Sequence, residues 1–198
     1  MTNPRTALLM LDYQVALVEE GPHLKMPPLA EQVRERDVLA TAARVLEHAR
    51  ESDWLVVHVR LAFDPSYVLR TNRLPRFDPY AENRVMLRDS PEAQIVKQVA
   101  PIDGEAIVDK GAVDPFVGTP LLHVLAAEGV GTVVLGGVAT NLVVESAARH
   151  ASDAGLQVTM VEDMCASFRA DFHEFSMTNI LPFFGQVTSS AALIGQSA

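Results

Sequence analysis

The chain has 198 residues, 48% of them hydrophobic and 21% charged, which is enough for one globular domain with a full hydrophobic core. It carries 16 Lys and Arg against 25 Asp and Glu, a formal net charge of −9. Because no basic stripe is left to neutralise a phosphate backbone or anionic lipids, we expect neither nucleic acid nor a membrane as a partner. The single cysteine, Cys165, excludes an internal disulfide framework and a cysteine-based zinc site, and it is a candidate nucleophile.

The beginning of the chain shows no targeting signal. Residues 1–6 are polar, and the apolar run 7–11 ends at Asp12, far short of the core of a signal peptide or of a transmembrane helix. The stretch 63–89, rich in Pro and Arg, is typical of a long loop and not of a linker between domains. We therefore expect one domain, 1–198, located in the cytoplasm.

Six short apolar runs, rich in β-branched residues, predict strands that are buried on both faces of a parallel sheet. Each run is followed by a helical pattern, which is typical of a doubly wound α/β fold. We predict a three-layer α-β-α sandwich around a six-stranded, mostly parallel sheet. The expected strands cover residues 7–11, 54–60, 106–108, 132–135, 157–161 and 186–188.

Helix boundaries are marked by glycines and by a capping pattern. Gly129 and Gly155 suit the left-handed position that follows a helix, and Asp171 with Glu174 has the spacing of a capping box. Ser90 followed by Pro91 predicts the start of a shorter helix. The expected long helices cover residues 29–52, 120–128, 141–154 and 171–181.

Chemically active residues follow three of the predicted strands. Asp12 ends the first strand and Gln14 comes shortly after it, Lys110 follows the third strand, and a glycine-led turn at 136–140 follows the fourth. Ligands of open parallel sheets bind outside the carboxyl ends of the strands. A carboxylate, an ammonium group and backbone N–H donors at this edge are the parts of a site for proton transfer and oxyanion stabilisation.

Five motifs in order span nearly the whole chain: LLMLDYQ at 8–14, VDK at 108–110 with PFVGT at 115–119, LGGVATNL at 135–142, VESAAR at 144–149 and VEDMCAS at 161–167. In this order and spacing they resemble the isochorismatase-like hydrolase superfamily. That group contains isochorismatases, nicotinamidases, N-carbamoyl amidohydrolases and ureidoacrylate amidohydrolases. The resemblance implies a six-stranded parallel sheet and, in the cysteine hydrolases, a triad of Asp, Lys and Cys.

Two members of that triad match Asp12 and Lys110, but the position of the cysteine is Val143. Isochorismatases proper also lack the cysteine, with glycine there, and cleave an enol ether without a covalent intermediate. They usually have a tyrosine in the turn, where this chain has Ala139. Because Val143 has no nucleophile, the acyl-thioester route is closed, and direct attack by water or protonation of the substrate remains. We expect Cys165 to be a buried, inert thiol.

The resemblance assigns further roles. Asp12 is the expected general acid or base, with Lys110 as its charge partner and a substrate contact. The N–H groups of Ala139 and Val143 are expected to bind the substrate oxygen, beside a cis peptide at 138–139. Burial beside Val143 would raise the pKa of Asp12 and Lys110 would lower it, and the sequence leaves the outcome open. The residues expected around the substrate are Gln14, Arg60, Phe116, Thr140 and Asn141.

No cofactor and no metal are expected. The histidines lack metal-ligand spacing, and the region after the second strand has only His58, where nicotinamidases carry an Asp-x-His motif with further histidines. Two interpretations of His58 and Arg60 stay open: one of them reaches the pocket, or the two have a paired structural role. The segment from Phe63 to Arg88, with Arg70 and three other arginines, is a lid, a subunit contact or simply a solvated face.

Two functions stay open at this point. The first is a cofactor-independent hydrolase that works without a cysteine on a small metabolite carrying an anionic, amide or enol-ether group. The second is a catalytically silent ligand-binding protein on the same scaffold; an engineered Val143 is a further, trivial explanation. Small molecules are the expected partners in each case, and the resemblance implies a homodimer or homotetramer.

Overall fold

The computed structural model describes residues 5–195. It contains one six-stranded sheet in the order β3-β2-β1-β4-β5-β6, and every neighbouring pair is parallel. The predicted fold class is confirmed, and the strand boundaries differ from the expected ones by a few residues. The strands are β1 (Arg5–Leu11), β2 (Leu55–Leu61), β3 (Ala106–Lys110), β4 (Val130–Gly137), β5 (Gln157–Val161) and β6 (Gln186–Thr188).

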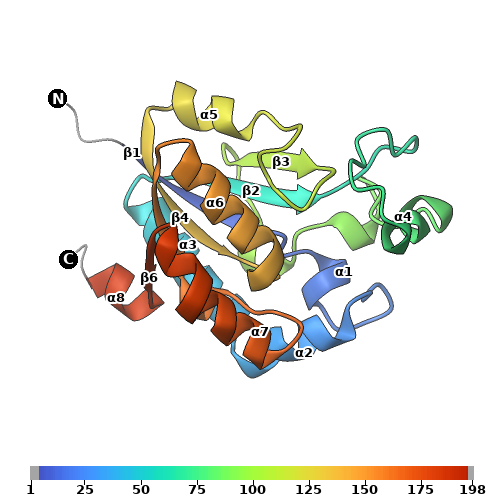
Figure 1. Cartoon of the computed structure of the whole chain (residues 1–198), viewed down its shortest axis with the longest axis horizontal. Helices are drawn as coiled ribbons and strands as arrows, with labels where there is room; N and C mark the ends of the chain where they lie inside the picture. Colours follow the sequence, from blue (N-terminus) through green and yellow to red (C-terminus); the bar gives the residue numbers. More distant parts are fainter. Residues whose placement is uncertain (1–4, 196–198) are drawn as a thin grey trace.

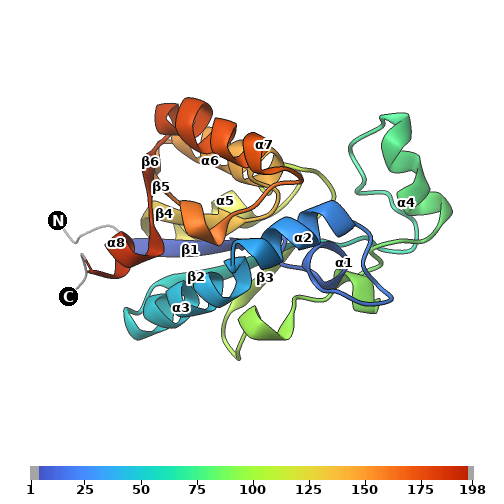
Figure 2. The same cartoon turned by 90° about the horizontal axis from the view of Figure 1, so that it is seen from below.

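Helices cover both faces of the sheet, because its central strands are apolar on both. In β1, Leu9 and Leu11 pack into one core cluster and Leu8 and Met10 into the other. Figure 2 shows three helices on one face, α5 (Leu121–Ala127), α6 (Glu145–Asp153) and α7 (Ala170–Phe175). On the other face lie α2 (Pro27–Glu35) and α3 (Val38–Glu51). The short helices α1 (Val15–Val18), α4 (Asp78–Glu82) and α8 (Ser190–Gly195) complete the chain.

The long helix expected at 29–52 is wrong, because the structure divides it into α2 and α3. The break falls at Arg36 and Asp37, and Asp37 has a left-handed backbone with φ 53°. The helix expected at 141–154 also changes character, because it opens as a π-helical turn, Thr140–Val144, before α6 begins. Gly129 and Gly155 do have positive φ after α5 and α6, as predicted.

Two predicted caps are not formed. Arg169 and not Asp171 precedes α7, no side chain caps this helix, and Asp171 instead pairs with Arg169. Ser90 precedes a short 3₁₀ turn, and its hydroxyl donates to the carbonyl of Leu87 instead of capping a helix. In both places a local side-chain contact competes with the cap that the spacing predicts.

The segment 63–89 is folded against the carboxyl end of the sheet. It contains α4, and Phe63, Tyr67 and Met86 form a buried cluster with partly buried Tyr80. Figure 1 shows α4 beyond the arrowheads of β2 and β3. This segment therefore forms an outer wall over the edge at which the site was predicted. In the described part of the chain, no helix is long and apolar enough to cross a membrane.

Candidate active site

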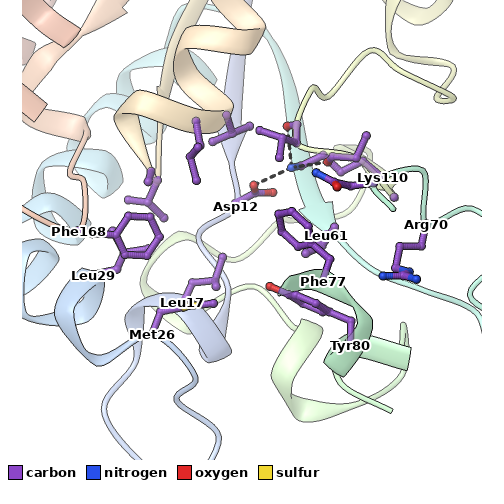
Figure 3. Close-up of a pocket in the computed structure, with 18 of the residues that line it drawn as sticks. Asp12, Leu17, Met26, Leu29, Leu61, Arg70, Phe77, Tyr80, Lys110 and Phe168 are labelled. Carbon is purple, nitrogen blue, oxygen red and sulfur yellow. Dashed lines mark hydrogen bonds and ion pairs between the residues drawn. The ribbon is translucent and has the colours of Figure 1, made fainter. Parts of the chain in front are cut away.

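A cavity of about 410 Å³ lies at the carboxyl ends of β1, β3 and β4. Four residues singled out in the sequence, Asp12, Lys110, Ala139 and Val143, line it together, and Figure 3 shows Asp12 and Lys110 at its centre. The rest of the lining is mainly apolar and comes from α1, the start of α2, the end of β2, the segment 63–89, the loops after β3 and before α7, and the turn after β4. The other lining residues are Leu17, Met26, Leu29, Leu61, Phe63, Arg70, Asn72, Phe77, Tyr80, Gly111, Ala112, Val113, Val138, Asn141, Leu142 and Phe168.

Asp12 lines this cavity, and only one of its two carboxylate oxygens is paired with another described residue. It stands directly after β1 in a left-handed conformation, φ 60°, and its backbone N–H donates to the carbonyl of Val59 at 2.9 Å. Oδ2 pairs with Lys110 Nζ at 2.8 Å. Oδ1 is buried and accepts no hydrogen bond from the described part of the chain. A buried polar atom without a partner is rare in folded proteins, so Oδ1 is the atom best placed to meet a substrate or water.

Lys110 is fully engaged by protein atoms. Besides Asp12, its ammonium group donates to the carbonyls of Ala112 and Val113, each at 3.0 Å. An ammonium group has three N–H donors, so all of them are used. Lys110 therefore holds Asp12 in place, and no donor is left for the substrate contact expected from the sequence.

Burial sets the direction in which the pKa of Asp12 is shifted. The pKa of this carboxyl is raised above its ordinary value because burial disfavours the charged form more than the ion pair with Lys110 favours it. This answers the question that the sequence left open. A carboxyl with a raised pKa, fixed at one oxygen and free at the other, is suited to exchange a proton with a bound molecule.

The turn after β4 brings backbone donors to the same cavity. The cis peptide expected between Val138 and Ala139 is present, and the N–H of Ala139 makes no hydrogen bond within the described part of the chain. Gly137 lets this turn approach β1, because a Cβ there would collide with the carbonyl of Leu11. Val143 packs in the wall of the cavity and is 1% exposed.

A chain of polar contacts supports this turn from behind. The Oγ1 of Thr140 lies 2.8 Å from His173 Nδ1, and His173 Nε2 lies 2.9 Å from Glu162. Glu162 is also paired with Arg36, which donates in addition to the carbonyl of Cys165. Thr140 is thus directed into this network and away from the cavity.

Three other residues expected around the substrate lie outside the cavity lining. Gln14 is fully buried, and its side-chain amide bonds the backbone of Leu61 and Ala93. Arg60 pairs with Asp109 at 2.6 Å. Phe116 packs in the core and stacks on His150. Asn141, by contrast, does line the cavity, and its Oδ1 accepts from Ser167 at 2.5 Å.

Cys165 is a buried thiol, as expected. It is 0% exposed, and its Sγ donates to the carbonyl of Val161 at 3.3 Å. Burial raises its pKa to about 12. It does not line the cavity. A thiol that stays protonated and has no access to the cavity is not a nucleophile for a ligand there.

Sequence reasoning missed two cavity residues of the segment 63–89. Asn72 and Tyr80 line the cavity, and Figure 3 shows the Tyr80 hydroxyl directed into it. That hydroxyl makes no hydrogen bond within the described part of the chain. Burial and the nearby charge of Asp12 raise the pKa of Tyr80. A tyrosine and an asparagine in a loop give no periodic signal, so only the folded segment reveals their place.

The family model described as the isochorismatase domain matches residues 6–192. The chain belongs to the isochorismatase family. Its relatives include the maleamate amidohydrolase of Pseudomonas putida, 29% identical over 185 residues, with 93% of this chain and 83% of the relative covered. The ureidoacrylate amidohydrolase of Methylobacterium radiotolerans is 28% identical over 202 residues, with 94% and 77% covered.

Two solved structures have the same fold. A cysteine hydrolase from Pseudomonas syringae pv. phaseolicola superposes with a TM-score of 0.79 at 26% identity, covering 99% of this chain and 98% of that one. An isochorismatase family protein from Desulfovibrio vulgaris has a TM-score of 0.84 at 22% identity, covering 98% and 99%. The chain therefore has the fold of these two structures over nearly its whole length.

Proposed function

We propose that this isochorismatase family member is a hydrolase of a small metabolite that works by non-covalent acid/base catalysis, with Asp12 as the proton carrier. The observation that carries the proposal is the unpartnered Asp12 Oδ1 in a cavity whose described lining contains no Cys, Ser or Thr side chain. Val143 stands where the resemblance places the nucleophilic cysteine. Water is then the attacking group.

For an amide substrate, ionised Asp12 accepts a proton from water as the water oxygen adds to the carbonyl carbon. Asp12 then gives that proton to the nitrogen as the C–N bond breaks. The N–H groups of Ala139 and Val143 stabilise the negative oxygen that forms in between. For an enol ether, protonated Asp12 supplies the proton to the substrate before water adds.

Amide or ureido cleavage is the preferred reaction class, because two relatives are named for it: a maleamate amidohydrolase and a ureidoacrylate amidohydrolase. The bond and the substrate are proposals for this chain. The mainly apolar cavity of about 410 Å³ suits a molecule of small size.

The first test is turnover by wild type and Asp12→Asn on a panel of small amides, ureido acids and enol ethers, with products identified by mass spectrometry. We expect Asp12→Asn to lower kcat by about 10²-fold or more, because it removes the proton carrier. The matched control is Asp53→Asn, since Asp53 also has a left-handed backbone but lies exposed on the surface. Unchanged turnover in Asp12→Asn would show that the mechanism is wrong.

The same assay tests the role of sulfur. Cys165→Ala is expected to keep wild-type kcat, because Cys165 lies outside the cavity. Iodoacetamide at pH 8 is expected to leave native activity intact for the same reason. Loss of activity in either experiment would contradict a cysteine-independent mechanism.

The missing side-chain nucleophile equally favours a second candidate, a ligand-binding protein without turnover. It predicts that wild type converts no member of the panel, while Val143→Cys gains weak amidase activity beside Asp12 and Lys110. Product formation by wild type at a rate above that of Asp12→Asn dismisses this candidate.

A further inference from the structure

Arg70 is a buried cation in the wall of the cavity with donors left over. Its side chain is 11% exposed, and its Nη2 donates to Asp78 Oδ1 at 2.9 Å. Its Nε and Nη1 are buried and have no hydrogen-bond partner in the described part of the chain. Burying N–H groups of a charged side chain without acceptors costs free energy, so this arrangement calls for an acceptor from outside the chain.

Local packing fixes Arg70 beside the catalytic residues. The backbone of Leu69 and Arg70 lies against Gly111, where a Cβ would collide with the Leu69 carbonyl, and Thr71 N donates to the Gly111 carbonyl at 3.3 Å. Gly111 directly follows Lys110, so the backbone at Arg70 is held against the end of β3. Figure 3 shows Arg70 on one side of Asp12 and Lys110, with Phe168 and Leu29 on the other.

The two cationic residues in the described lining of the cavity differ in how many of their donors are already used. Lys110 is paired with Asp12 and has all its donors used. Among the described lining residues, Arg70 is the other cation, and its partner Asp78 is 45% exposed. An anionic group is repelled by the Asp12 carboxylate and attracted to Arg70, so it would bind at the Arg70 end and leave the reactive bond near Asp12.

We infer that Arg70 binds a carboxylate of the substrate and restricts the enzyme to small carboxylic acids. Nη2 has two hydrogens and gives one to Asp78, so one complete pair of parallel N–H groups remains, either with Nε or with Nη1. Such a pair matches the two oxygens of a carboxylate. The inference deepens the proposed function and rests on it for the identity of the cavity as the substrate site.

The other arginines of the region whose side chains the structure describes are engaged or exposed. Arg60, the candidate from the sequence, pairs with Asp109, and Arg88 pairs with the other oxygen of the same carboxylate at 2.6 Å. Arg73 and Arg84 are exposed and do not line the cavity. The buried donors of Arg70 therefore replace Arg60 as the anion-binding group.

The test compares binding of 3-phenylpropanoate and 4-phenylbutan-2-one, a neutral methyl ketone of nearly the same size that contains no bond for the enzyme to hydrolyse. Calorimetry or ligand-observed NMR on wild type is expected to show at least about tenfold tighter binding of the carboxylate. Arg70→Gln is expected to abolish that preference while keeping the affinity for the ketone. Arg73→Gln, an exposed arginine of the same segment, is the matched control and should keep the preference.

Equal binding of the two probes by wild type would overturn the inference, as would a preference that survives in Arg70→Gln. The wild-type comparison needs no variant, so the inference stays testable even if Arg70→Gln does not fold. Because binding is measured without turnover, a carboxylate preference in a protein that converts no substrate would contradict the proposed hydrolase function and leave the Arg70 site standing. Turnover that depends on Asp12 in a protein without any carboxylate preference would support the proposed hydrolase function and contradict the Arg70 inference.

Discussion

At the scale of single residues, the site is organised by how completely each polar group is bonded. Lys110 has three acceptors for three donors, whereas Asp12 Oδ1 and two nitrogens of Arg70 have no partner in the described residues. Groups with complete bonding hold geometry, and groups with incomplete bonding are available to a ligand. This difference separates Lys110, a positioning residue, from Asp12 and Arg70.

We predict that the pKa of Asp12, measured by ¹³C NMR of labelled carboxyl groups, lies above 3.8 in wild type, because burial raises it. Lys110→Met should raise this pKa further, since it removes the charge and hydrogen bond that favour the ionised form. Lys97→Met, at an exposed lysine, is the control and should leave it unchanged. A pKa that falls in Lys110→Met would contradict this account.

The sign of the linked stability follows from the same shift. Since the pKa of Asp12 is raised on folding, the folded state binds the proton more tightly than the unfolded state does. The contribution of Asp12 to the free energy of unfolding therefore falls as pH rises from 3.8 through the raised pKa. At neutral pH the buried Asp12 carboxyl therefore lowers the free energy of unfolding.

At the scale of elements, the break between α2 and α3 has a consequence for the site. It places Arg36 against Glu162 and the Cys165 carbonyl, and Glu162 in turn contacts His173 of α7. His173 then contacts Thr140 in the turn that carries the backbone donors. Elements from both faces of the sheet are joined through Glu162 to the base of the turn after β4.

We predict that Glu162→Gln lowers the free energy of unfolding at pH 7 by about 1 kcal/mol, a value kept small because Glu162 is partly exposed. His173 and Arg36 lower the pKa of Glu162 from 4.5 to about 2, so this contribution is present above pH 4.5 and is lost as pH falls toward 2. Urea unfolding at pH 7, 5 and 3 should show that the difference in the free energy of unfolding between wild type and variant becomes smaller as the pH falls.

The control for this experiment is Glu20→Gln, which removes an ion pair with Arg34 that is exposed on both sides. It should change stability little at any of the three pH values. A Glu162→Gln difference that is constant or grows toward pH 3 would contradict the predicted role of the network.

At the scale of the whole molecule, several large apolar side chains are exposed. Phe183 is 83% exposed, and Leu74 and Phe175 are more than half exposed. Large apolar side chains that are exposed in the single chain are candidates for burial in an interface between copies. Their exposure is consistent with the homodimer or homotetramer that the family resemblance implies.

We predict that light scattering after size exclusion gives two or four times the chain mass of 21.5 kDa. Phe183→Ser and Leu74→Ser, at two exposed apolar positions, test which surface is used, and at least one should shift the mass toward the monomer. Lys97→Ser, at an exposed polar position, is the control. A monomeric wild type at micromolar concentration would contradict the prediction.

The sequence by itself determined the fold class and which residues meet at the carboxyl edge of the sheet. Apolar runs report burial on both faces, and Asp12, Lys110 and the turn at 138–140 follow strands whose ends must meet at one edge of a parallel sheet. These conclusions depend on local pattern and topology alone, which is why they survive in the structure.

Only the tertiary structure decided which side chains face the cavity and which are already bonded. It paired Arg60 with Asp109, turned Thr140 toward His173, and brought Arg70 and Tyr80 from an irregular segment into the cavity. It also settled the direction of the pKa of Asp12, which depends on burial against an ion pair. Desolvation and hydrogen-bond partners arise from residues far apart in the chain, so no local pattern encodes them.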